Sequence, residues 1–146
     1  MATLYTSGSV LGNSAFKPSP QGAMGVRSAT FAAGALVVND VIQMCDVFKG
    51  ETVVGVVITT TDLDTGGSPA IVLDTGYGGA TAALIDGSTI GQAGGTASSF
   101  AVGNATHGSA AVSPVVFAAD DTIDILVQVA PQTTAAGTIT MYLFVA

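Results

Sequence analysis

Two stretches near the C-terminal end alternate between apolar and other side chains, and this pattern constrains the fold more than any other feature. The stretches are DTIDILVQVA (121–130) and GTITMYLFVA (137–146). Their alternating apolar positions are Ile123, Ile125, Val127 and Val129, then Ile139, Met141, Leu143 and Val145. A period of two places successive side chains on opposite faces of a β-strand. We therefore predict two strands with one buried face each, and we expect Ile125 and Met141 to lie in the interior.

A second pair of strands is predicted earlier in the chain. VIQMCDVF (41–48) and TVVGVVITTT (52–61) are joined by KGE, which predicts a hairpin across Gly50. The second run is apolar on both faces, which predicts an inner strand. Its faces hold Val54, Val56 and Ile58 on one side, and Val53 and Val57 on the other. Gly55 within this run indicates a bulge or a close backbone approach.

The remaining segments predict further short strands and little helix. AVSPVVF (111–117) is typical of a strand that Pro114 confines to an edge or a bulge. Within 79–110 we expect a short helical turn at 82–85 and one strand around 96–102. About eight strands with glycine-rich turns predict an all-β, two-sheet β-sandwich, specifically a jelly roll. An immunoglobulin-like sandwich is the alternative, although its Cys and Trp markers are missing.

The stretch DLDTGG (62–67) lies between two predicted strands, and its Asp and Gly residues are those that turns require. A calcium-binding EF-hand loop starting at Asp62 would need Glu at its twelfth position, which is Leu73. A looser calcium site using Asp62 and Asp64 stays open. As simple turn residues, both aspartates are expected to be replaceable with little change in melting temperature. Asp74, in LDTGYGG, is predicted to lie in another turn or bulge.

The composition points to a chain that packs against other chains. Its 146 residues fit one domain. Only 9% of them are charged, against about 25% in ordinary domains. Small, weakly polar side chains lose little entropy when they are buried, although a bland soluble domain is the alternative. The net charge is −7 with three cations, too few to neutralise nucleic-acid phosphates or to bind anionic membranes.

Residues 1–23 are predicted to form an extended N-terminal arm, and residues 24–146 a single β-sandwich domain. Pro18 and Pro20 disfavour regular structure in the arm. Its isolated apolar residues need a surface to pack on, and we expect them to form an interface. These residues are Leu4, Tyr5, Val10, Leu11 and Phe16. A disordered tail is the alternative.

No combination of residues in the sequence predicts a catalytic, cofactor or metal site. Cys45 lies in an apolar run and is expected to be a buried small hydrophobe. His107, the one histidine, lies among loop-forming residues. Neither a Gly-x-Ser-x-Gly nucleophile motif nor a phosphate-binding loop occurs. We therefore expect no catalytic residues, no cofactor and no metal, and a protein that is not an enzyme. The first residues lack a basic region and a continuous apolar stretch, so we expect an intracellular origin.

The stretch AGALVVNDVIQMCDVFKGETVVGVVITTTDLDTGGSPAIVLDTGYG begins at Ala33, and with AALIDG (82–87) it resembles head decoration, or cement, proteins of tailed bacteriophages. The resemblance implies a jelly roll, frequently trimeric, that binds the outside of the capsid shell. The implied partners are the major capsid protein and further copies of this chain in a homotrimer. The implied location is the exterior of the virion, after synthesis in the host cytoplasm. The arm would then pack on a sister subunit or on the shell.

Other functions stay open. One is a different virion component, such as a head-fibre base, a tail protein or an adaptor. Another is a carbohydrate-binding β-sandwich, which needs exposed aromatic side chains to stack on sugar rings. The sequence has no Trp, three Tyr and six Phe, so it fits this class poorly.

Overall fold

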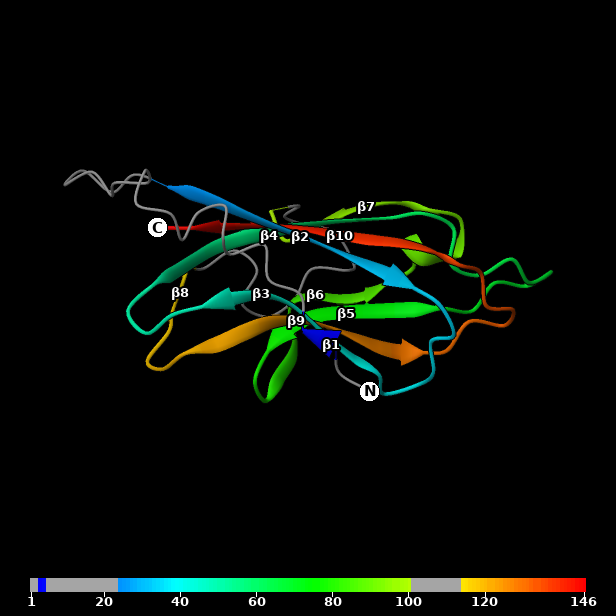
Figure 1. Ribbon diagram of the computed structural model, residues 1–146, viewed down its shortest axis with the longest axis horizontal. Helices are drawn as coiled ribbons and strands as arrows, with labels where there is room; N and C mark the ends of the chain where they lie inside the picture. The colour runs from blue at the N-terminus through cyan, green and yellow to red at the C-terminus, as the bar shows by residue number, and fades with distance from the viewer. Residues whose placement is uncertain (1–2, 5–23, 101–113) are drawn as a thin grey trace.

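The computed structural model describes residues 3–4, 24–100 and 114–146, and their regular structure is almost entirely β. Two five-stranded sheets lie face to face, as Figure 1 shows. One 3₁₀ turn, η1 (Ile90–Gln92), accompanies them. The predicted all-β, two-sheet sandwich is confirmed. No helix in the described part of the chain is long and apolar enough to cross a membrane.

Each sheet combines strands from distant parts of the sequence. The first has the order β1 (Thr3–Leu4), β3 (Val41–Val47), β9 (Asp121–Val129), β5 (Val72–Tyr77) and β6 (Ala80–Ser88). The second has the order β2 (Gly25–Ala33), β10 (Gly137–Val145), β4 (Thr52–Thr60) and β7 (Gly95–Ser98). The short β8 (Val115–Val116) also pairs with β4. All pairs are antiparallel except β1 with β3.

The eight longer strands follow the connectivity of a jelly roll. From β2 to β5 the chain changes sheet at every step, and it does so again between β6 and β7, between β8 and β9, and between β9 and β10. Only β5 and β6 are consecutive neighbours joined as a hairpin. This arrangement agrees with the predicted jelly roll.

The predicted hairpin across Gly50 is wrong. A tight turn does form, because the Glu51 N–H donates to the Phe48 carbonyl at 3.0 Å and Gly50 has φ of 87°. However, β3 pairs with β9, while β4 pairs with β10. The two strands therefore lie in different sheets, and the turn bridges the layers at one end of the sandwich (Figure 1). Turn residues specify a chain reversal, but they do not specify which strands pair.

β4 is the inner strand that its two apolar faces predict, since it lies between β10 and the short strands β7 and β8. Phe144 pairs with Gly55 but Val145 pairs with Val53, so Val54 is the extra residue of a β-bulge. This extra residue shifts the alternation, and Val53 joins Val56 and Ile58 on the buried face. The expected grouping of Val54 with Val56 and Ile58 is therefore wrong.

The segment after residue 79 holds a strand where a helical turn was expected. Residues 82–85 lie within β6, which returns from β5 after Gly78, whose φ is 46°. The expected strand around 96–102 is found as β7, Gly95–Ser98. Of 111–117, the part that the structure describes contains β8, a two-residue edge strand directly after Pro114. Residues 101–113 lie outside the described residues.

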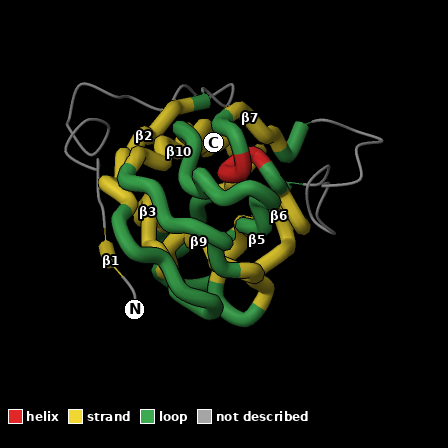
Figure 2. The backbone as a smooth tube through the Cα atoms, turned by 90° about the vertical axis from the view of Figure 1, so that its right-hand side faces the viewer, coloured by secondary structure: helices red, strands yellow, loops and turns green. Residues whose placement is uncertain are grey.

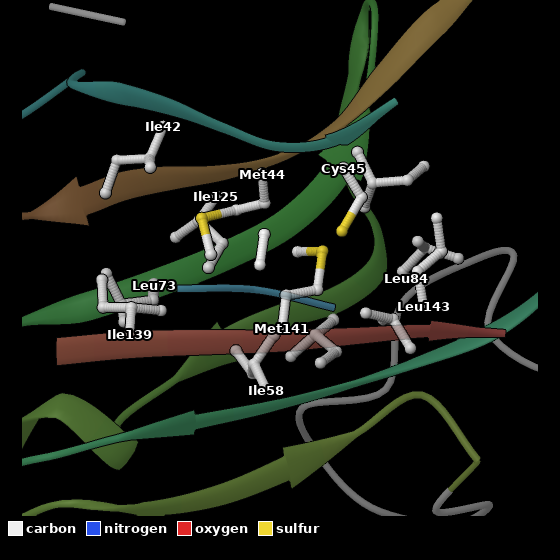
Figure 3. Packing of buried hydrophobic residues seen from close by; sticks show 14 of the residues in the cluster. Ile42, Met44, Cys45, Ile58, Leu73, Leu84, Ile125, Ile139, Met141 and Leu143 are labelled. Atoms are coloured by element: carbon white, nitrogen blue, oxygen red, sulfur yellow. The ribbon is translucent and has the colours of Figure 1, made fainter. Parts of the chain in front are cut away.

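The core fills the space between the two sheets, and Figure 3 shows apolar side chains from both layers pointing toward each other. Ile125, on β9, and Met141, on β10, are fully buried, as the alternation predicts. Val129 was expected on the same face as Ile125 but is exposed near the end of β9, beyond a register shift against β5. Cys45 is buried as expected, and burial raises the pKa of its thiol to about 12.

Candidate interaction surfaces

Asp64 holds together two loops at one end of the sandwich, the end that faces the viewer in Figure 2. Its side chain is 1% exposed. Oδ1 accepts hydrogen bonds from the N–H groups of Gly66 (3.1 Å) and Thr133 (2.9 Å). Oδ2 accepts them from Ala70 (2.6 Å), Ile71 (3.2 Å) and Gln132 (2.8 Å). One carboxylate thus joins the β4–β5 loop to the β9–β10 loop.

The same hydrogen bonds determine the charge state of Asp64. Burial by itself raises the pKa of this carboxyl, but the backbone N–H groups of Thr133, Ala70, Gln132 and Gly66 outweigh burial and lower it well below its usual value. DLDTGG is therefore a turn, as predicted. These contacts speak against the expectation that Asp64 can be replaced with little change in melting temperature, because its carboxylate accepts backbone N–H groups from two loops.

The geometry also contradicts a calcium site at Asp62 and Asp64. Both oxygens of Asp64 already accept backbone N–H groups, whose positive ends would face a bound cation. Asp62 Oδ1 accepts the Asp64 N–H at 3.0 Å. Within residues 24–100 and 114–146, no three His, Cys, Asp or Glu side chains are grouped as a metal site requires.

Arg27 closes the opposite end of the sandwich, between β2 and the β3–β4 turn. Its Nη1 donates to the Asp46 carbonyl (2.8 Å) and to Glu51 Oε2 (2.6 Å), while Nη2 pairs with the other Glu51 oxygen. The guanidinium lies 5.4 Å from the centre of the Phe48 ring. Burial opposes ionisation of Glu51, but the hydrogen bond from Arg27 helps to lower its pKa. This cation is engaged inside the protein, so it does not contribute to an external basic patch.

The sheet containing β2 and β10 presents an outer surface without charge. Arg27, buried and paired, is the one charged residue in strands β2, β4, β7, β8 and β10. We call the outer surface of this sheet the neutral face. It is lined by Val26, Thr30, Val57, Phe100, Tyr142 and Phe144. Val26, Tyr142 and Phe100 are 39%, 41% and 44% exposed.

Phe100 completes the neutral face by lying on a glycine. A Cβ added to Gly55 would overlap the Phe100 ring, so the aromatic ring packs directly on the β4 backbone. Its edge contacts Phe144, with ring centres 5.4 Å apart and planes at 81°. Gly55 thus combines both features expected of it, a neighbouring bulge and a close approach.

The opposite sheet is acidic. Strands β3, β5, β6 and β9 contain five aspartates and no Lys or Arg: Asp46, Asp74, Asp86, Asp121 and Asp124. Burial and, to a smaller extent, the charge of Asp121 raise the pKa of Asp124 to about 6, against the opposing effect of a hydrogen bond from the Thr122 hydroxyl. Burial also raises the pKa of Asp74, with a further contribution from Asp86. The carboxylates of this sheet therefore oppose one another's ionisation.

The expected arm interface is described only in part. The backbone of β1, which contains Leu4, pairs in parallel with the edge of β3, with Thr3 opposite Ile42 and Leu4 opposite Gln43. Tyr5, Val10, Leu11 and Phe16 lie outside the described residues, as does His107. The neutral face was not predicted from the sequence. The absence of acidic residues from its strands was a visible signal, but it needed the strand order to be interpreted.

No protein-family model and no curated protein matches this chain. Two solved structures contain chains of similar fold. One is the capsid of Ralstonia phage GP4, in which the matching chain is 26% identical with a TM-score of 0.69, over 99% of this chain and 97% of that one. The other is the cyanophage Pam1 capsid asymmetric unit, at 22% identity and a TM-score of 0.64, over 84% and 83%. The second likeness concerns the fold alone.

Proposed function

We propose that this chain is a structural protein of a phage virion that decorates and stabilises the capsid by binding the outside of the major capsid protein shell. The observation that carries this proposal is the match over nearly the full length of both chains to a chain from a phage capsid.

The surface chemistry supports a role in packing. One sheet has a neutral face rich in threonine, valine and aromatic residues. Such side chains are inexpensive to order on contact, because β-branched and aromatic groups have few rotamers to lose. The other sheet supplies carboxylates that suit a partner with cationic groups.

The arm is proposed to extend the interface. In this proposal residues 1–23 reach from the domain of residues 24–146 to a sister subunit in a homotrimer or to the shell. Leu4, Tyr5, Val10, Leu11 and Phe16 would supply the apolar contacts. β1 pairs with the edge of β3 in the same chain, so this sheet edge accepts an extended segment through backbone hydrogen bonds, and the proposal extends that mode of contact to the rest of the arm.

Purified phage heads that lack this protein provide the test. The protein is expected to co-sediment with such heads, saturably, and to raise the temperature at which they rupture. Mass spectrometry of complete particles should give a copy number close to that of the major capsid protein. A few copies per particle would instead support a head-fibre base, a tail protein or an adaptor. No association with particles would contradict a virion role.

A further inference from the structure

The two sheets differ in charge to an extent that the overall composition does not reveal. Five of the ten acidic residues lie in β3, β5, β6 and β9, and the other five lie in loops and turns. None lies in β2, β4, β7, β8 or β10. The neutral face is thus a broad surface without carboxylates, in a chain of net charge −7.

We propose that the neutral face is where copies of this chain contact one another. Two identical acidic molecules repel least when they meet through surfaces without carboxylates, because bringing like charges together and desolvating them is unfavourable. A foreign partner is not restricted in this way, since it can present cations to the acidic sheet. This inference rests on the homo-oligomer of the proposed function, and it names the surface that forms it.

The size and chemistry of the neutral face fit such a contact. Three nine-residue strands, flanked by β7 and β8, cover roughly 500–600 Å² at about 4.8 Å between strands and about 3.3 Å per residue. Two such faces packed directly together reach the roughly 1,000 Å² that specific interfaces need. In a ring of three, each face is divided between two neighbours, so each pair buries roughly 500 Å² and the trimer depends on closing all three contacts. Tyr142 and Phe100 are exposed aromatic groups of the kind that interface cores favour.

The arrangement is compatible with threefold symmetry. Tyr142 lies on β10, which is flanked by β2 and β4, so it stands near the middle of the face. Three copies that turn their neutral faces toward a common axis each contact both neighbours. The acidic sheets then point away from the axis, where they are as far apart as possible.

The test introduces one carboxylate at a time and measures mass without any phage heads present. Tyr142→Glu and Thr30→Glu place a charge on the neutral face at exposed positions of β10 and β2. Gln128→Glu is the matched control, because it adds the same charge at an exposed position of β9. Far-ultraviolet circular dichroism and melting temperature establish that each variant is folded.

Size-exclusion chromatography with light scattering should show an oligomer for the wild type and for Gln128→Glu. The two neutral-face variants should dissociate at concentrations at least about 10-fold higher than the wild type does. A monomeric wild type overturns the inference. So does equal dissociation of Gln128→Glu, which would mean that net charge alone matters, or unchanged oligomers of Tyr142→Glu and Thr30→Glu.

A truncated protein distinguishes whether copies associate through the neutral face or through the arm. Without residues 1–20, the domain should still self-associate, even if more weakly, and Tyr142→Glu should abolish that association. A truncated protein that is monomeric at every concentration would show that the arm holds the copies together, and it would overturn the inference. The oligomer assay contains no phage heads. A wild type that forms oligomers but does not bind heads would therefore contradict the proposed function and leave this inference standing.

Discussion

At the scale of single residues, one aspartate makes more long-range hydrogen bonds than its local sequence suggests. Asp64 accepts five backbone N–H groups from two loops that are distant in sequence. Asp62, two residues earlier, is exposed, and its Oδ1 accepts the Asp64 N–H. Nothing in the letters DLD distinguishes the two, because the difference lies in partners that arrive only when the chain has folded.

Asp64→Ala should therefore destabilise the protein far more than Asp62→Ala. Removing the Asp64 carboxylate leaves buried N–H groups without acceptors, which is among the most costly single changes. We expect the melting temperature to fall by roughly 10 °C or more for Asp64→Ala and by only a few degrees for Asp62→Ala. Differential scanning calorimetry at pH 7 measures both, and similar values for the two variants would contradict the role of Asp64.

Replacing Asp124 should stabilise the protein at pH 7, whereas replacing Asp64 should destabilise it. Its pKa of about 6 in the folded protein exceeds the ordinary value of about 3.9, so its contribution to stability is lost as pH rises from about 4 to 6. Asp124→Asn keeps an oxygen for the Thr122 hydroxyl and removes the charge. Because solvent screens this half-buried group, we expect a gain of about 1 kcal/mol at pH 7.

Urea unfolding at several pH values tests the Asp124 prediction. The stability difference between Asp124→Asn and the wild type should be present at pH 7 and small at pH 4, where Asp124 in the folded protein is neutral, as Asn is. Asp64 does not affect the comparison between pH 4 and pH 7. Because its pKa is lowered in the folded protein, its contribution to the free energy of unfolding is lost only below about pH 4. An equal difference at both pH values would mean that the substitution acts through packing rather than charge.

The core offers a third test at this scale. Ile125→Ala should cost about 2–5 kcal/mol, as truncations of fully buried aliphatic side chains do. Leu126→Ala should cost less, because Leu126 lies on the opposite face of β9 and is only half-buried. Chemical denaturation of both variants gives the comparison, and a larger loss for Leu126→Ala would invert the assignment of faces.

At the scale of elements, β4 shows how one extra residue changes which side chains reach the core. The bulge at Val54 lies opposite the step from Phe144 to Val145 on β10. Beyond it the alternation of β4 is shifted by one residue, which a strict period of two does not anticipate. Gly55 lies directly after the bulge and allows the Phe100 ring to lie against the strand.

A double-mutant cycle on Gly55 and Phe100 tests this contact. Gly55→Ala should cost about 1–3 kcal/mol, since the new methyl group overlaps the ring and displaces it. In a Phe100→Ala background the same change should cost less than about 0.5 kcal/mol, because the obstructing ring is gone. Additive effects in urea unfolding would show that Phe100 does not pack on Gly55.

At the scale of the whole molecule, the sandwich separates a neutral sheet from an acidic one, and the N-terminal β1 adds to the edge of the acidic sheet. The proposed contact between copies would use the neutral face, while the proposed arm contact would use a different part of the molecule. The jelly roll supplies this separation, because its alternating connections distribute consecutive strands between opposite layers.

Deletion of residues 1–20 tests the arm at this scale. Every core residue in the described part of the chain lies at Ala29 or a later position, so far-ultraviolet circular dichroism should be unchanged. The truncated protein should lose stability of its oligomer, affinity for undecorated heads, or both, if the arm supplies the apolar contacts proposed for it. Light scattering and co-sedimentation measure the two properties, and wild-type values for both would make the arm a passive tail.

The sequence by itself determined the features that depend on neighbouring residues. Alternation placed Ile125 and Met141 inside, because the direction of successive side chains in a strand is a local property. The turn at Gly50 was visible for the same reason, and the scarcity of charge needed no structure at all.

Only the tertiary structure decided the features that depend on which strands pair. It placed β3 and β4 in different sheets, inserted the bulge at Val54, and brought Thr133 to Asp64. It also collected the uncharged strands into one sheet and five aspartates into the other. Hydrogen-bond partners in a sandwich come from distant parts of the chain, and their choice depends on packing the whole core at once.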